Sequence, residues 1–541
     1  MLKNFCDISR TVITSGAVLS GNTWMQKPEE IKMENRDFFG KALLALAVIV
    51  GMVPTAASMA GETDFGMAQQ HRIKAQSNRL FGITQPLKES APATGDDYRT
   101  SEQKAEDHVL LAKGLKAEYL TREAGNATDM MVLFPKSAPT HLVTCVEGSR
   151  QDLGGGKFNP SVQRIDLLTG QVETILRGMD RCDGIRTTAW GTVLATEETD
   201  DGSAYEILDP LNVTEQTVTD RGAAGTPATV TDAGDVVKRI ALPAMAWEGL
   251  AVLDNGVVIG GDELRPGTDE LDTDGGAIFK FIPDVPLTGG SNITDLAASP
   301  LVSGSVYVLQ ISCQDSGRSS FPQYGQGCEV GQGAWVRVEA ATARADANSN
   351  GATGYYRPED LHRDPLFQDP DHPAAVRFCW TNTGNEDSEN FAEVMCGVDK
   401  TPLPANPGEI VDERTGFSYL ADGASYAIAS VNRFVEGDGD FNSFDNLDFQ
   451  PETGILYVIE DHDNGDIFAC LPDGGDRDIK TDGCVKVISV KDTSAEPTGF
   501  FFSPVGRTAY LSIQHSDDGN MPLFDGYRTD DVLIITGFKV K

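Results

Sequence analysis

The sequence predicts an all-β fold: a six-bladed β-propeller preceded by an N-terminal arm and a signal peptide that is cleaved. Short runs of β-branched and aromatic residues recur from about Met130 onward, and Gly, Asp, Asn and Pro separate them. Asn255-Gly256 between two apolar runs is the strongest hairpin signal. No long stretch with helical periodicity interrupts these runs. A β-sandwich is the structural alternative.

Residues 1–60 are expected to be a leader that carries the signal peptide. An apolar run at 42–53 is too short to span a bilayer, and Lys41 precedes it. Small residues follow at the spacing of a cleavage site near Ala60. The basic flank belongs to a start at Met33, so we expect residues 1–32 to lie upstream of the true start. No later segment is suited to span a membrane.

The remaining chain is expected to divide into an arm, residues 61–125, and the propeller, residues 126–541. The arm mixes polar residues with a helix-like patch at roughly 101–121. Hairpin units recur at variable spacing in the propeller region, as blades with insertions do. Blades of about 65 to 70 residues would divide this region into six.

Each recurring hairpin begins and ends with polar residues. The two ends of a hairpin lie at the same edge of its sheet, and blades around an axis bring these edges to one mouth. The acids that this arrangement would collect are Asp183, Glu197, Glu198, Glu248, Asp262, Glu263, Glu359, Asp445, Glu460 and Asp461.

Converging carboxylates require either water or cations around them. Two like charges 4 Å apart repel by about 4 kcal/mol at an effective dielectric near 20. A single acid of this kind is ordinarily a solvated loop residue, but repetition at equivalent positions favours a set of metal ligands. Oxygen ligands favour calcium or other hard ions. The chain has only seven histidines and no His-Glu-x-x-His pattern, which argues against a zinc hydrolase.

The net charge is −37, from 44 basic and 81 acidic residues. Such a charge repels nucleic acid and anionic lipid, because both bind proteins through cationic side chains. Acidity of this kind is ordinarily a matter of solubility in a salty medium. The other interpretation is that part of the excess binds cations.

Nine cysteines fit an exported protein in an oxidising compartment. Three pairs close short polar loops: Cys313 with Cys328, Cys379 with Cys396, and Cys470 with Cys484. Spacing alone leaves two roles open for Cys182, a disulfide with Cys145 or a metal ligand.

Arg357-Pro358-Glu359 places an arginine beside an acid of the proposed cluster. A fixed guanidinium beside metal ions is suited to bidentate phosphate binding. A structural salt bridge is the alternative. No Gly-rich phosphate loop or Gly-x-Ser-x-Gly elbow is present, so any hydrolysis is expected to depend on bound metal ions.

Four motifs in this order resemble PhoX-type alkaline phosphatases, from about residue 140 to the C-terminus. They are 181–198 (Arg-Cys-Asp-Gly to Glu-Glu), 357–361 (Arg-Pro-Glu-Asp-Leu), 445–461 (Asp-Asn-Leu to Glu-Asp) and 496–515 (Glu-Pro-Thr-Gly to Gln-His). The resemblance implies a six-bladed propeller with a central Fe(3+) and Ca(2+) cluster. It also implies release of phosphate from a broad range of monoesters.

Site roles follow from this resemblance by position. Cys182 resembles an iron-ligating cysteine, which leaves a disulfide with Cys145 as the alternative. Arg357 is expected to contact phosphate and, with Glu359, to be catalytic. Cys145-Val146-Glu147 stands where the family has Asn-His-Glu, so Cys145 is expected at a substrate-contacting position. The expected metal ligands are Cys182, Glu147, Glu197, Glu198, Glu248, Asp262, Glu263, Glu359, Asp445, Glu460, Asp461 and Glu496.

The sequence therefore predicts an exported, metal-dependent phosphomonoesterase that acts on small phosphate esters. We expect a monomer in the periplasm or outside the cell, with no nucleic-acid partner. Two alternatives stay open: a phosphodiesterase or lactonase-type calcium propeller hydrolase, and a non-enzymatic exported propeller stabilised by calcium.

Overall fold

The computed structural model describes residues 71–95, 98–266, 275–311, 329–385, 390–403, 408–411, 418–421, 428–471, 483–514 and 519–540. All of these residues lie in one compact unit, Glu62–Lys541. None of the helices in these ranges is both long and apolar enough to cross a membrane. The leader and the Cys313–Cys328 pair lie outside the described residues.

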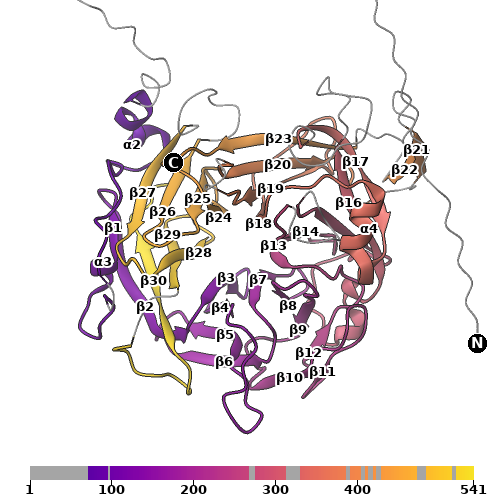
Figure 1. The fold of residues 1–541 in the computed structure, drawn as a ribbon, viewed down its shortest axis with the longest axis horizontal. Coiled ribbons are helices and arrows are strands. Elements are labelled where there is room, and N and C mark those ends of the chain that lie inside the picture. Colours follow the sequence, from indigo (N-terminus) through magenta and orange to yellow (C-terminus); the bar gives the residue numbers. More distant parts are fainter. Residues whose placement is uncertain are drawn as a thin grey trace, which may run out of the picture. The chain divides into compact units, whose positions relative to one another are not determined.

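Antiparallel sheets follow one another along the chain from residue 128 onward and surround a central axis (Figure 1). The first sheet has the order β11-β10-β6-β5-β4-β3, in which only β10 and β6 pair in parallel. Its strands are β3 (Thr128–Phe134), β4 (His141–Val146), β5 (Pro160–Asp166), β6 (Val172–Arg177), β10 (Gln216–Asp220) and β11 (Thr229–Val230). The second sheet contains β7 (Cys182–Thr187), β8 (Val193–Glu197), β9 (Ala204–Ile207) and β12 (Val236–Lys238).

A nine-stranded sheet follows, in the order β13-β14-β15-β16-β17-β23-β20-β19-β18. β17 joins its two halves, because it pairs with β16 on one side and with β23 on the other. Its strands are β13 (Trp247–Val252), β14 (Val258–Asp262), β15 (Ile278–Pro283), β16 (Gly304–Ile311), β17 (Gly331–Val338), β18 (Pro358–Arg363), β19 (Val376–Asn382), β20 (Glu393–Asp399) and β23 (Ala429–Glu436).

The last two large sheets combine C-terminal strands with strands from the N-terminal segment. One contains β1 (Val109–Leu111), β24 (Phe444–Phe449), β25 (Leu456–Glu460), β26 (Asp466–Cys470) and β27 (Cys484–Val490). The other contains β2 (Lys116–Gly125), β28 (Glu496–Phe502), β29 (Thr508–Gln514) and β30 (Thr529–Thr536). A separate hairpin pairs β21 (Gly408–Val411) with β22 (Ser418–Ala421).

The N-terminal segment is therefore built into the sheets: β2 pairs with β30, and β1 pairs with β27. The helix-like patch expected at 101–121 is wrong beyond α3 (Ala105–His108), because β1 begins directly after it. β-sheet pairing with the C-terminal strands overrides the local helical pattern there. The other helices of the described residues are α2 (Ser77–Leu80), α4 (Ala343–Asn350) and the short 3₁₀ turns η1 (Leu296–Ala298), η2 (Pro300–Val302) and η3 (Ala340–Thr342).

The inner edge strands of the sheets pack against one another around the axis, in the cyclic order β3-β7-β13-β18-β24-β28. The core lies between neighbouring sheets, where large aromatic side chains such as Trp247 and Trp380 are almost completely buried. The predicted all-β, propeller-like architecture is confirmed.

Two of the expected disulfides are confirmed, Cys379–Cys396 and Cys470–Cys484. The third disulfide of the described residues joins Cys145 to Cys182. It links β4 to β7, and both cysteines are completely buried. Of the two roles left open for Cys182, the structure has the disulfide.

Candidate metal centre

Six hairpins, each containing one inner edge strand, carry an irregularity at or near the start of that strand. In the first hairpin Thr128 pairs with Val146 and Met131 pairs with Thr144, so two inner residues face one residue of the partner strand. An extra residue of this kind is a β-bulge, which bends the strand and re-aims a side chain. The same shift occurs at the start of β7, β13, β18 and β24, and three residues into β28.

An acidic residue occupies the first bulge position in five of these six hairpins. The glycine that follows two of the acids allows close packing, since a Cβ on Gly184 would lie 2.0 Å from the Glu248 carbonyl oxygen and one on Gly249 would lie 1.9 Å from the Leu361 nitrogen. Neighbouring inner strands therefore approach closely beneath the acids. The five acids are Asp129, Asp183, Glu248, Glu359 and Asp445.

A second set of acids follows the last paired residue of the returning strand. These acids come directly after the residues that pair with the start of each inner strand. They are Glu147, Glu198, Glu263 and Asp461, and the fourth hairpin has Thr383 at this position.

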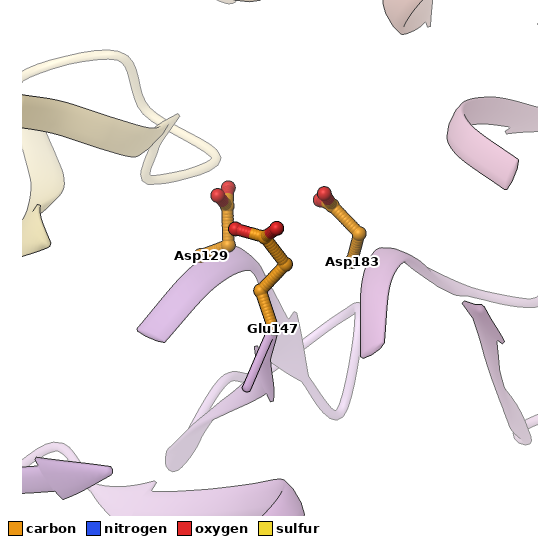
Figure 2. Close-up of side chains that lie close together, drawn as sticks. All are labelled: Asp129, Glu147 and Asp183. Carbon is orange, nitrogen blue, oxygen red and sulfur yellow. The ribbon is translucent and has the colours of Figure 1, made fainter. Parts of the chain in front are cut away.

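All acids of the two sets except Glu263 line one cavity of about 380 Å³, called the mouth cavity below. Figure 2 shows the carboxylates of Asp129, Glu147 and Asp183 directed into a common space. In three groups, ligand oxygens of all members lie within 4.8 Å of one another: Asp129, Glu147 and Asp183; Asp183, Glu198 and Glu248; Glu248, Glu359 and Asp445. The cavity is also lined by Asn126, Arg181, Arg357, Asp461, Glu496 and Gln514.

Five of the expected ligands do not line this cavity: Cys182, Glu197, Asp262, Glu263 and Glu460. Successive strand residues point to opposite faces, so the first acid of each adjacent pair is directed away from the mouth. Glu197 is bound by Arg221, with 2.8 Å between Nε and Oε1, and Asp262 is bound by Arg344, with 2.8 Å between Nε and Oδ2. Glu460 accepts hydrogen bonds from the backbone N–H groups of Asn442 and Asp466. These three acids have structural partners outside the cavity, and their role as metal ligands stays a prediction.

Two further predictions concern the cysteines. Cys182 is bonded to Cys145, so its sulfur is not a thiolate ligand in this structure. Cys145 is completely buried and is not available to contact substrate. Both positions lie one residue before or opposite a bulge, where the side chain points into the core rather than the mouth. The expected roles of both cysteines are corrected.

Arg357 lies in the cavity beside three acids. Its Nε donates to Oε1 of Glu263 at 2.6 Å, and its Nη2 lies 3.0 Å from Oε1 of Glu359 and 3.7 Å from Oδ2 of Asp461. The structural salt bridge considered from the sequence is therefore present. Arg357 nevertheless faces the open cavity, so a role in phosphate binding stays a prediction.

Several carboxylates of the cavity resist ionisation in the absence of cations. Burial, followed by repulsion from neighbouring acids, raises the pKa of Asp183, Glu248 and Asp445 well above the ordinary range. Burial raises the pKa of Glu359 to about 8, although Arg357 opposes this effect. Burial and Asp461 raise the pKa of Glu496 to about 11. A cluster of this kind is stabilised by positive charge that the chain itself supplies only in part.

The donor set fits hard cations. Oδ1 of Asp183 is buried and has no hydrogen-bond partner among the described residues, and Asp183 belongs to two of the three close groups. A bound cation would satisfy this oxygen, since buried polar atoms are nearly always paired. All members of the three groups are carboxylates, the ligands that calcium prefers.

The expectations from the sequence missed two residues of this cavity in particular. Asp129 lies in a bulge that carries no glycine or turn signal, and its Oδ1 accepts a hydrogen bond from Thr498 at 2.6 Å. Arg181 stands directly before Cys182 and contacts Glu147 and Glu198. Arg181 lies two residues before the bulge acid Asp183, as Arg357 lies two residues before Glu359. This shared position could have identified Arg181 from the sequence.

Comparisons with known proteins agree with these features. The family model described as alkaline phosphatase PhoX matches residues 266–517. The structure of Pseudomonas fluorescens PhoX in complex with vanadate, a transition state analogue, has a TM-score of 0.51 and 17% identity, and the match covers 83% of this chain and 97% of that chain.

Two other solved structures match less well. A putative gluconolactonase has a TM-score of 0.36 and 11% identity, covering 81% of this chain and 97% of its own. The aldose sugar dehydrogenase of Streptomyces coelicolor in its PQQ-bound form has a TM-score of 0.32 and 11% identity, covering 79% and 99%. No curated protein sequence matches the chain significantly. The resemblance of this chain to the PhoX alkaline phosphatase family is thus confirmed.

Proposed function

We propose that this protein is a metal-dependent phosphatase that releases phosphate from small phosphate monoesters. The observation that carries the proposal is the mouth cavity, where carboxylates from five inner strands meet beside two arginines. A site with many acidic ligands and fixed guanidinium groups suits an anionic substrate only when cations occupy it. The PhoX family model supports the same reaction class.

The metal ligands that we propose are the acids of the cavity: Asp129, Glu147, Asp183, Glu198, Glu248, Glu359, Asp445, Asp461 and Glu496. Glu263, which holds Arg357, remains a candidate at its edge. Bound cations would supply polarisation of the phosphoryl oxygens and activation of water. Calcium matches the carboxylate donors best, and the iron implied by the resemblance would also have to bind through oxygen.

Arg357 is proposed to hold the phosphoryl group of the substrate. Glu263, Glu359 and Asp461 surround its Nε and Nη2 atoms and fix the orientation of the guanidinium. A planar guanidinium held in this way is prepared for bidentate phosphate binding before substrate arrives. Glu359 pairs with Arg357 and lies within 4.8 Å of two other acids of a ligand group, so we propose that it couples substrate position to the bound cations.

The organisation of the chain is part of the proposal. β17 joins two four-stranded halves of the nine-stranded sheet, and counting these halves separately would give six blades. We propose residues 1–60 as an export leader cleaved near Ala60, residues 61–125 as the arm and residues 126–541 as the propeller of a periplasmic or extracellular monomer. Mass spectrometry of the secreted protein would test the cleavage site.

One observation favours a second candidate function. The disulfide of Cys145 removes that position from substrate contact, so the phosphate-binding geometry differs from the one that the resemblance implies. A phosphodiesterase on the same calcium propeller is the alternative that this difference favours. A panel of monoesters, diesters and lactones separates the two functions.

The direct test is hydrolysis of p-nitrophenyl phosphate at alkaline pH by protein supplied with calcium and iron. We expect chelation to abolish turnover and added calcium, with or without iron, to restore it. Arg357→Ala should lower kcat/KM by about 10²–10³-fold, because a fixed donor to the transition state is lost.

Arg337→Ala is the matched control, since Arg337 is exposed and packs on Tyr307 away from the cavity residues. It should leave kcat/KM unchanged. Lack of turnover of every phosphate ester in the metal-loaded protein would refute the proposal.

A further inference from the structure

Two arginines occupy the same position in two different hairpins. Arg181 stands two residues before the bulge acid Asp183, and Arg357 stands two residues before the bulge acid Glu359. Both have left-handed backbone conformations, with φ of 52° and 57°. Such a conformation costs a non-glycine residue about 1–3 kcal/mol and persists where the surrounding structure imposes it, often at functional sites. The backbone thus turns both side chains into the same cavity.

The position is a repeated feature of the mouth. Ala127 and Ser443 also lie two residues before a bulge acid, and their φ angles of 66° and 52° are left-handed as well. The four residues therefore have equivalent backbone geometry, but only two of them carry a charged side chain. The hairpins therefore differ at this position in the charge of the side chain and not in the backbone conformation.

The two guanidinium groups are anchored alike. Nε of Arg181 donates to Oε2 of Glu198 at 2.9 Å, and its Nη2 contacts Glu198 and Glu147. Nε and Nη2 of Arg357 are held by acids in the same manner. In both residues Nη1 has no hydrogen-bond partner among the described residues. The side chain of Arg181 is 41% exposed and lines the cavity.

We propose that Arg181 is a second substrate-binding guanidinium and that it gives the site its preference for phosphomonoester dianions over diester monoanions. This inference rests on the proposed function. A charge-assisted hydrogen bond to a second anionic oxygen favours the ligand with more negative charge. A diester has an esterified oxygen in place of one charged oxygen and would gain less from Arg181.

The experiment compares Arg181→Gln and Arg181→Lys with the unchanged protein, all loaded with calcium and iron. The measured quantities are kcat/KM for p-nitrophenyl phosphate and for bis(p-nitrophenyl) phosphate, inhibition by inorganic phosphate, and metal content by elemental analysis. Arg337→Gln is the control. Arg181→Lys keeps a positive charge beside Glu147 and Glu198 but loses the planar fork.

For Arg181→Gln we expect kcat/KM for the monoester to fall about 10- to 100-fold and phosphate inhibition to weaken equally, because one charge-assisted contact is lost. The diester rate should change less than about threefold, with metal content unchanged. Arg181→Lys should recover part of the monoester rate.

Equal losses for both esters, or a parallel loss of metal, would overturn the inference, because Arg181 would then only position Glu147 and Glu198. Phosphate binding by calorimetry separates this failure from failure of the proposed function. Unchanged protein that binds phosphate, with Arg181→Gln binding it equally well, contradicts only the role of Arg181. Unchanged protein that neither binds phosphate nor hydrolyses either ester contradicts the proposed function itself.

Discussion

Glu359 and Asp360 are neighbours in the same β-bulge, yet they belong to opposite electrostatic regions. Both are buried. Burial raises the pKa of Glu359 to about 8, since the attraction of Arg357 is offset by Glu263 and Asp461. Burial also acts on Asp360, but His362, Arg186 and hydrogen bonds outweigh it and lower the pKa to about 2.

The region around Asp360 supplies enough hydrogen-bond and charged partners to keep this carboxylate ionised. Oδ1 of Asp360 accepts from Nη2 of Arg186 at 2.7 Å, and Oδ2 lies 3.1 Å from Nε2 of His362 and accepts the N–H of Leu447 at 3.2 Å. Nδ1 of His362 in turn lies 3.3 Å from Oδ1 of Asp448. These residues come from β7, β18 and β24, so the network fastens three inner strands together.

The region around Glu359, which is the mouth cavity, has more negative charge than its arginines can balance. Nine of the residues lining the mouth cavity are carboxylates, and two are arginines. Repulsion among close carboxylates is strong in a partly buried site, which works against folding unless protons or cations bind. Asp360 and its partners therefore stabilise the propeller. The carboxylates of the mouth cavity destabilise the folded state until a cation binds to them.

The largest expected effect on stability comes from replacing Asp360 or Glu359 by the corresponding amide. Asp360→Asn should lower the free energy of unfolding by about 3–5 kcal/mol, because Arg186 and His362 lose the charge that pairs them. Glu359→Gln should leave the metal-free protein equally stable or more stable, since it removes a carboxylate that resists ionisation. Urea unfolding in chelator checks both, and equal destabilisation by the two variants would contradict the comparison.

Much of the convergence could be predicted, because hairpin ends must share an edge and the acids recur at those ends. The face of each acid could not be read from a pair such as Glu197-Glu198, since strand alternation sends one residue to each side and the register decides which. The disulfide of Cys182 was equally ambiguous, because its partner lies on the neighbouring sheet. The place of Asp129 in the cavity could not be predicted either, because Thr498, which donates a hydrogen bond to it, is distant in sequence.

A second, smaller effect should appear in the pair Glu197 and Glu198. Glu197 is bound by Arg221 through two contacts of 2.8 and 3.0 Å, and the N–H of Asp180 donates to it at 3.0 Å. Burial nevertheless raises the pKa of Glu197, so its network is less favourable than that of Asp360.

Glu197→Gln should therefore cost about 1–3 kcal/mol of stability, because Arg221 loses the buried one of its charged partners. Glu198→Gln should change metal-free stability little and weaken calcium binding instead. Calorimetric calcium titration beside urea unfolding measures both effects. The distinction fails if Glu197→Gln weakens calcium binding as much as Glu198→Gln does.

A further expected effect is the pH dependence of the metal-free protein. Glu359 has a folded pKa of about 8, against about 4.3 for an unfolded glutamate. The folded state therefore binds more protons than the unfolded state between these values, and stability should fall as pH rises from about 4.5 to about 8. Asp360 acts in the opposite direction: its contribution is complete above about pH 4 and is lost as pH falls toward its folded pKa of about 2.

Metal-free protein should accordingly be more stable at pH 5 than at pH 8, as measured by the midpoint of urea unfolding in chelator. Saturating calcium should reduce this difference, because cations bound to the mouth carboxylates favour their ionised form and lower their pKa values. Glu359→Gln should reduce it as well, without any metal. A metal-free protein that becomes more stable between pH 5 and pH 8 would show that the mouth acids are ionised and solvated in the folded state, which removes the reason for a cation to bind there.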